Sequence, residues 1–452
     1  MHKSHIKAAL ETLKTWLDST LVRQYLQDSI WMTIARLLWM LSAILVGIAV
    51  ARKLGPSDFG YLNYVVAYVS LFGVIANLGL DVIINRELVK HPENEGRILG
   101  NYFVFKLISV ASMLTAMGIS FIFADERRFI ISCMTIALGY MLYPLSVVQC
   151  LFIASVKNRY IAWSQIACCL VYNAIRLCAV LNSASLAMYF AAEAILVGFS
   201  FAMMFLFYWK CCNSPLKWSF RWHEVWALLP AALPMSITTV LSLVYSRTDT
   251  LMLKHYLGTE SVGLYTIASR FTENLSLFVQ ILSQIFSAAV ISAYAISSAE
   301  YSKQLHRYYF LLFWISAPPI ILLLLIGEPL ITFLYGNAFM ASASILNWHI
   351  LSLPFNGLLL AFYCHAVNEH RLSMIAAVFC SGALLNVPLN MLLIPRIGAP
   401  GAAICSAAAM PIGMALTLLF TSQGRRDLKF MLRSIFTLPS FRMGLVEDGH
   451  KD

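Results

Sequence analysis

Residues 51–62 read ARKLGPSDFGYL, and residues 254–265 read KHYLGTESVGLY. Three residues keep their identity and spacing between the two stretches: Leu54, Gly55 and Gly60 in the first, and Leu257, Gly258 and Gly263 in the second. In each copy a long apolar segment precedes the motif and another follows it. Because glycine allows a tight turn between two helices, the motif predicts the corner of a helical hairpin. Its recurrence predicts a chain built from two similar halves, a pattern typical of membrane transporters.

The composition indicates a polytopic membrane protein. Hydrophobic residues make up 60% of the 452 residues and charged residues only 12%, with a mean hydropathy of +0.74. A soluble globule of this size could not bury so much apolar surface. A spanning helix needs about 20 mostly apolar residues, and only helices or closed barrels satisfy their backbone in lipid. The apolar runs are too long for barrel strands, so we expect an all-α integral membrane protein.

Apolar runs between polar, proline or glycine breaks predict twelve transmembrane helices in two pseudo-symmetric six-helix bundles. The first bundle, residues 29–210, has expected spans at 29–50, 59–84, 99–123, 129–154, 160–181 and 186–209. The second bundle, residues 227–421, has expected spans at 227–250, 262–292, 308–326, 342–366, 372–394 and 399–421. The remaining segments are an amphipathic N-terminus at 1–28, a linker at 211–226 and a basic tail at 422–452.

The Lys and Arg residues predict the orientation, because positive charge stays on the cytoplasmic side of short loops. With the N-terminus inside, 21 of the 32 basic residues fall on cytoplasmic segments and six on outer loops, so we expect both termini in the cytoplasm. The terminal segments alternate charged and apolar residues and suit an anionic inner leaflet. We therefore attribute the net charge of +10 to membrane topology and expect no nucleic-acid partner.

The sequence carries no motif of an enzyme or of an ATP-driven pump. Eight of the ten cysteines lie in apolar spans, and none has metal or redox spacing. It contains no P-loop, no H-E-x-x-H zinc motif and no G-x-S-x-G elbow. The predicted periplasmic loops are too short to build the site of a membrane glycosyltransferase or polymerase. We expect no catalytic residue, no metal and no cofactor, and transport coupled to a gradient of H⁺ or Na⁺.

Three segments carry a family resemblance. They are residues 51–61 with ARKLGP and FGY, residues 333–346 with FLYG followed by Ala341, Ala343, Ile345 and Leu346, and residues 386–403, NVPLNMLLIPRIGAPGAA. These segments resemble those of the Wzx-type polysaccharide biosynthesis proteins, which are O-antigen and capsule repeat-unit flippases. That family is part of the multidrug/oligosaccharidyl-lipid/polysaccharide exporter superfamily.

The resemblance implies a V-shaped pair of six-helix bundles in the bacterial inner membrane. Its implied substrate is an undecaprenyl-diphosphate-linked oligosaccharide for O-antigen, capsule or exopolysaccharide, moved from the cytoplasmic to the periplasmic leaflet. Membrane lipids, the polysaccharide polymerase and the chain-length machinery are the implied partners. The alternative is a multidrug exporter of the same superfamily that exchanges cationic drugs for protons or sodium. Such an exporter should present acidic and aromatic groups, whereas Lys and Arg outnumber carboxylates within these spans.

Ionised side chains within the spans are the candidate residues of a substrate lumen. A charge at mid-bilayer costs about 2.5–3.5 kcal/mol, so it should face a wet cavity or a partner. Arg36 and Lys106 either line the lumen or snorkel to the inner surface. Arg247 and Asp249, two residues apart, do not share a helix face, so each needs another partner. Arg176, near the outer end of its span, is either an interface anchor or a functional residue of the cavity.

The eighth span contains the strongest lumen candidate. Arg270 and Glu273 are three residues apart and share a helix face. The polar residues around them are Ser269, Thr272, Asn274 and Ser276. The alternative to a substrate site is a structural ion pair that joins two helices.

Three further ionisable residues have two interpretations each. Asp81 and Arg86, at the inner end of the second span, form a gate or remain solvated interfacial residues. Glu193, with only apolar neighbours in the sixth span, is either protonated or carries a coupling proton.

Overall fold

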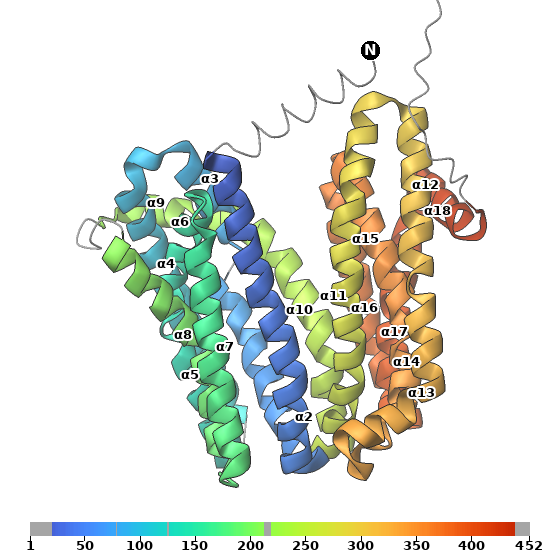
Figure 1. Cartoon of the computed structure of the whole chain (residues 1–452), viewed down its shortest axis with the longest axis horizontal. Coiled ribbons are helices and arrows are strands. Elements are labelled where there is room, and N and C mark those ends of the chain that lie inside the picture. The colour runs from blue at the N-terminus through green and yellow to red at the C-terminus, as the bar shows by residue number, and fades with distance from the viewer. Residues whose placement is uncertain (1–19, 78, 124–125, 212–217, 439–452) are drawn as a thin grey trace, which may run out of the picture. The chain divides into compact units, whose positions relative to one another are not determined.

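The computed structural model describes residues 20–77, 79–123, 126–211 and 218–438, and all regular elements in these ranges are helices. The chain divides into two compact units, Met1–Lys254 and His255–Asp452, hereafter unit 1 and unit 2 (Figure 1). We expected the division in the linker at 211–226, part of which lies outside the described residues. The helix that follows this linker is grouped with unit 1 as far as Lys254.

Unit 1 is an all-helical bundle. Its helices are α2 Thr20–Asn77, α3 Asp81–Lys90, α4 Glu95–Ser120, α5 Arg127–Tyr140, α6 Val147–Ala154, α7 Asn158–Leu181, α8 Leu186–Cys211, α9 Trp222–Ala227 and α10 Leu229–Leu257. The fourth predicted span is not continuous, because a short 3-10 helix, Tyr143–Ser146, containing Pro144 separates α5 from α6. Proline lacks the N–H that would continue the α-helical ladder, which accounts for this break.

Unit 2, like unit 1, is built from helices, most of which are long and apolar. Its helices are α11 Thr259–Ile296, α12 Ser298–Trp314, α13 Ala317–Tyr335, α14 Ser342–His349, α15 Ser352–Asn368, α16 Leu372–Ile397, α17 Ala399–Leu419 and α18 Ser422–Phe436. The ninth predicted span, 308–326, corresponds to α12 and α13 together, which are interrupted only around Ile315 and Ser316.

Both copies of the repeated motif form the predicted helical corner. Gly55 has φ +70° inside α2, where two helices meet, and Gly258 has φ +86° between α10 and α11. A positive φ is strained for residues with a side chain, so these two positions require glycine. Gly336 and Gly398, in the other two family-like segments, also have positive φ at helix junctions.

The described helices account for the twelve predicted spans. Ten helical segments are long and apolar enough to cross a membrane, and one of them, residues 30–77, contains the two helices that meet at Gly55. The predicted span 227–250 corresponds to α10, a 29-residue helix that is not among these ten segments. The chain is therefore an all-α, multi-pass membrane protein.

The helix α18 follows the last span and is amphipathic, as expected for the basic tail. Met431 and Ile435 are buried against unit 2, whereas Arg425, Arg426 and Lys429 are exposed. The Trp314 side chain donates a hydrogen bond to the Ile435 carbonyl at 2.9 Å. The N-terminal segment 1–19 and residues 439–452 lie outside the described residues.

Candidate functional site

Lys106 and Asp81 form an ion pair in unit 1. Lys106 Nζ donates to Asp81 Oδ1 at 2.7 Å and to Ser146 Oγ at 2.6 Å, and it lies 5.1 Å from the centre of the Tyr143 ring. The Lys106 side chain is fully buried, whereas 45% of the Asp81 side chain is exposed. Lys106 therefore does not snorkel to the surface, and Asp81 is the accessible member of the pair.

Local backbone features bring these residues together. A break after Asn77, with Gly79 at φ +64°, ends α2 early, so Asp81 starts a separate helix instead of ending the second span. A carboxylate in the first turn of a helix is favourable because of the helix dipole. The 3-10 turn at Pro144 presents Tyr143 and Ser146 to the ammonium. The sequence indicated each charged residue separately but not their pairing.

Glu193 is not isolated, contrary to the sequence-based expectation. It accepts a hydrogen bond of 2.7 Å from the Tyr172 hydroxyl, which in turn accepts one of 2.9 Å from Arg176 Nη1. The Arg176 guanidinium also lies over the Tyr172 ring, 4.9 Å from its centre. Arg176 is only 4% exposed, and its Nε is buried without a hydrogen-bond partner. Arg176 is thus a buried member of a polar chain and not an interface anchor.

Arg247 and Asp249 in α10 differ in burial, as expected for residues on different helix faces. Asp249 is 3% exposed, whereas Arg247 is half-buried, with its guanidinium in electrostatic range of Tyr140. Arg247 Nε is buried and has no hydrogen-bond partner. Arg36 of α2 and Arg86 of α3 are both exposed on unit 1.

The polar patch of the eighth span lies on α11 of unit 2. Glu273 is exposed and Arg270 is half-buried, in electrostatic range of the Tyr335 hydroxyl. Ser276 accepts a hydrogen bond of 3.3 Å from the Asn356 amide of α15. Thr272 is buried, and its hydroxyl has no hydrogen-bond partner. The patch therefore combines two charged residues, Arg270 and Glu273, with a polar residue, Ser276, that is hydrogen-bonded to a neighbouring helix.

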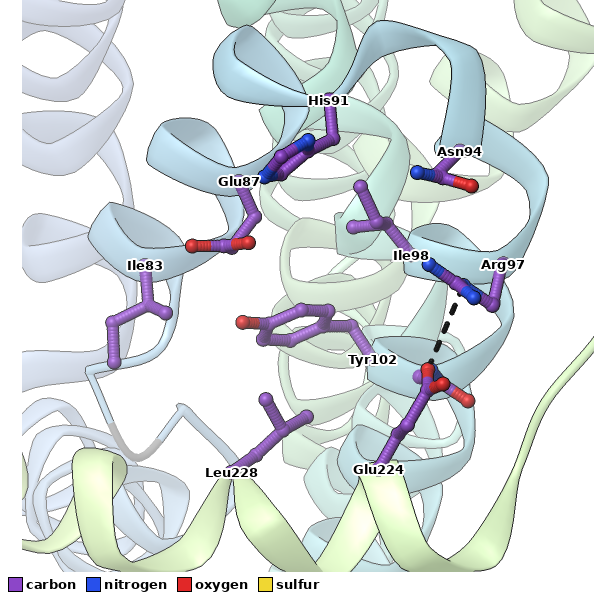
Figure 2. A pocket seen from close by; sticks show the side chains of 10 residues that line it. Ile83, Glu87, His91, Asn94, Arg97, Ile98, Tyr102, Glu224 and Leu228 are labelled. Atoms are coloured by element: carbon purple, nitrogen blue, oxygen red, sulfur yellow. Dashed lines mark hydrogen bonds and ion pairs between the residues drawn. The ribbon is translucent and has the colours of Figure 1, made fainter.

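A pocket at the predicted cytoplasmic end of unit 1 was missed by the sequence analysis (Figure 2). It has a volume of about 230 Å³ and is lined by residues of α3, α4 and α9. Glu224 accepts a hydrogen bond from the Asn101 amide at 2.6 Å and lies 3.7 Å from Arg97. Figure 2 shows the Tyr102 hydroxyl on the side of Glu87, and this buried hydroxyl has no hydrogen-bond partner.

This pocket is chiefly the place where the linker between the two halves attaches to unit 1. The Arg221 N–H donates to the Asn101 side chain at 2.8 Å, and the Ser219 N–H donates to the Gly96 carbonyl at 3.3 Å. The backbone at Ser219 packs so close to Gly100 that a Cβ at Gly100 would clash with the Ser219 carbonyl oxygen. Because small-molecule sites are usually larger than about 300 Å³, this pocket is too small for a glycan lipid.

A buried charged cluster attaches α18 to unit 2. Arg371 Nη1 donates to Asp427 Oδ2 at 2.6 Å, and His365 Nε2 lies 2.9 Å from Arg371 Nη2 and 3.4 Å from Asp427 Oδ1. The Tyr301 hydroxyl is 2.9 Å from His365 Nδ1. Burial raises the pKa of Asp427, but hydrogen bonds from His365 and Arg371 and the charge of both outweigh burial, so this pKa lies below its usual range. The carboxylate is therefore ionised and holds α18 in place.

Comparison with known protein families gives two matches. The family described as polysaccharide biosynthesis protein matches residues 25–291, which is more than half of the 452-residue chain. The MatE family matches residues 234–392. A comparison with curated protein sequences gives no match.

Several solved structures share the fold. The lipid II flippase MurJ in an inward closed conformation is 16% identical, with a TM-score of 0.69 and 91% of each chain covered. An inward-facing MATE multidrug transporter of the MOP superfamily is 14% identical, with a TM-score of 0.66, and covers 87% of this chain and 96% of its own. A point mutant of the Vibrio cholerae MATE transporter VcmN is 14% identical, with a TM-score of 0.57, and covers 92% of this chain and 99% of its own. The chain belongs to the polysaccharide biosynthesis protein family and has the fold of the MOP-superfamily transporters.

Proposed function

We propose that this protein is a flippase that moves an undecaprenyl-diphosphate-linked oligosaccharide repeat unit across the bacterial inner membrane. The glycan would serve O-antigen, capsule or exopolysaccharide synthesis. The match to the polysaccharide biosynthesis family supports this class of substrate. The likeness of the fold to that of the lipid II flippase MurJ also supports a lipid-linked substrate.

The observation that carries the proposal is the polar face of α11, with half-buried Arg270. A diphosphate is an anion for which an arginine fork is a suitable partner. Arg247 in unit 1 has a buried Nε without a hydrogen-bond partner, and this group is a second candidate contact for the diphosphate. Arg36, exposed on α2, is a third candidate cation for the diphosphate.

We further propose that an H⁺ or Na⁺ gradient drives alternating access, since the chain has no ATP-binding motif. Two carboxylates of unit 1 are candidates for coupling. Asp81 is half-exposed and bonded to a buried ammonium, and Glu193 is joined to Arg176 through Tyr172. Protonation of either carboxylate would weaken a buried pair and so change the balance between two packings. The basic residues of the loops support cytoplasmic termini, and the polymerase and chain-length machinery are the proposed downstream partners.

The test is restoration of surface polysaccharide in a strain that lacks its own copy of this protein. Wild type should restore the polysaccharide, and Arg270→Gln should fail at normal protein abundance. Arg270→Lys should keep part of the activity, because the charge remains although the bidentate fork is lost. Arg396→Gln, at an exposed arginine of α16, is the matched control and should behave as wild type.

The double substitution Arg270→Gln with Glu273→Gln separates a substrate contact from a structural ion pair. If the two residues only compensated each other, removal of both charges would restore function. Continued failure at normal protein level would support the substrate role. Rescue would refute it.

Multidrug export is the second candidate function, because the MatE family matches residues 234–392. Under this alternative the protein would export a cationic dye such as ethidium from cells in a manner that depends on the ion gradient. Dye export together with failure to restore surface polysaccharide would favour the drug exporter over the flippase.

A further inference from the structure

The C-terminal half of α11 carries a stripe of uncharged polar residues. Ser276, Gln280, Ser283, Gln284 and Ser287 follow one another at intervals of three or four residues, apart from the adjacent pair 283 and 284. Such spacing places them along one helix face over about 16 Å. From Asn274 to the end of α11 at Ile296 the sequence contains no Asp, Glu, Lys or Arg. This part of the stripe thus offers amides and hydroxyls without charge.

All residues of the stripe except Ser276 line a pocket of about 310 Å³ within unit 2. The pocket lies between α11, α12 and α15, and its polar lining residues are Gln280, Ser283, Gln284, Ser287, Tyr308, Tyr363 and Asn368. We call it the glutamine pocket. Its volume is at the lower end of the range for small-molecule sites, which begins at about 300 Å³.

Packing between helices explains only part of this polarity. The Ser283 hydroxyl is 2.6 Å from the buried Tyr308 hydroxyl, a pairing that joins α11 to α12. Gln280 and Gln284, by contrast, are exposed, and within the described chain their side-chain amides have no hydrogen-bond partner. Transfer of an unpaired amide from water into hydrocarbon is strongly unfavourable. Two such groups on consecutive turns indicate a face that meets water or a polar ligand instead of acyl chains.

The chemistry of the pocket favours saccharides over ions. A glutamine amide both donates and accepts hydrogen bonds, as do the hydroxyls and N-acetyl groups of sugars. Tyr363 is 50% exposed, and its ring offers an apolar surface in the same pocket as these amides. A diphosphate would require cations and a cationic drug would require carboxylates, and the pocket has neither among its lining residues.

We propose that the glutamine pocket binds uncharged sugar residues of the lipid-linked glycan. The inference rests on the proposed function and extends it, because it assigns the glycan and the diphosphate to different residues. Gln280 and Gln284 hydrogen-bond to the sugar, Tyr363 packs on its ring face, and the arginines bind the diphosphate. The pocket thus distinguishes a glycosylated lipid from its sugar-free carrier.

The test compares two probes on the purified full-length protein. One is the undecaprenyl-diphosphate-linked repeat unit extracted from the native host after deletion of this protein, and the other is undecaprenyl diphosphate alone. Wild type should bind the glycosylated lipid more tightly. Gln280→Leu and Gln284→Leu should each weaken its binding by about 3- to 10-fold, as for a lost hydrogen bond, and leave the sugar-free lipid unaffected. Leucine is compatible with insertion into the membrane, so loss of folding is not expected.

Three variants serve as controls. Gln165→Leu makes the same substitution in a span of unit 1, outside the pocket, and should bind both lipids as wild type does. Tyr363→Phe should keep the affinity for the glycosylated lipid, whereas Tyr363→Leu should lower it, because only the second removes the ring.

The outcomes separate this inference from the proposed function. Unchanged preference for the glycosylated lipid in both glutamine variants would overturn the glutamine pocket and leave the flippase proposal intact. An equal loss of affinity for both lipids would also overturn it, because the glutamines would then contact the lipid carrier or affect folding. Failure of wild type to bind either lipid would refute the proposed function and this inference with it.

Discussion

The Lys106–Asp81 pair predicts asymmetric effects on stability, because its two side chains differ in burial. The Lys106 ammonium is fully buried, 2.7 Å from Asp81 Oδ1, whereas 45% of the Asp81 side chain is exposed. Asp81→Asn leaves a buried ammonium without a charged partner, and breaking a buried pair in this way costs about 3–5 kcal/mol. We expect about 3 kcal/mol, since the amide oxygen still accepts a hydrogen bond. Lys106→Met removes the buried charge itself and should cost about 1 kcal/mol, as for a half-exposed pair.

The assay is thermal unfolding of each purified variant in detergent, followed by tryptophan fluorescence. Asp58→Asn is the matched control, because it breaks an exposed pair with Arg128 at 3.6 Å. That change should fall within about 0.5 kcal/mol of wild type. The double variant Asp81→Asn with Lys106→Met should be more stable than Asp81→Asn alone. The reasoning is refuted if Asp81→Asn destabilises no more than Asp58→Asn, or if Lys106→Met is the more damaging single change.

Three further predictions concern topology, the helical corner and the attachment of α18. Reporter fusions at residues 215 and 430 should report a cytoplasmic location and fusions at residues 126 and 183 a periplasmic one, and a periplasmic signal at 215 would contradict the six-plus-six scheme. Gly55→Ala should lower the free energy of unfolding by about 1 kcal/mol, because Gly55 has a positive φ. Gly118→Ala is the control at an equally open helical site and should raise the free energy of unfolding by about 0.4–1 kcal/mol. Equal effects of the two substitutions would show that φ is not the cause. Asp427→Asn should increase proteolysis at Arg425 and Arg426. In wild type the rate of this proteolysis should not change between about pH 5 and 8. The pKa of Asp427 is lower in the folded protein than in the unfolded chain, so its contribution to stability is complete above the unfolded pKa. That contribution is lost only as the pH falls through the folded pKa.

The architecture was predictable because its determinants are local in the sequence. Twelve spans follow from runs of apolar residues, and the corners at Gly55 and Gly258 follow from a motif in which only glycine tolerates the backbone angle. The boundaries that were wrong have local causes too. Pro144 interrupts the fourth span, and the turn at Gly79 ends the second span before Asp81, although neither interrupts the apolar run.

The candidate sites were only half predictable, because a polar residue in a membrane helix implies a partner without identifying it. Glu193 seemed isolated because Tyr172, which donates to it, is 21 positions away on another helix, and a tyrosine in an apolar span has many ordinary roles. The same reasoning applied to Gln280 and Gln284 gives a different result. Their amides also need a partner, and the described chain supplies none, although it supplies one for the neighbouring Ser283. A polar group that stays unpaired after the helices have packed indicates a ligand more strongly than a charge that the bundle neutralises.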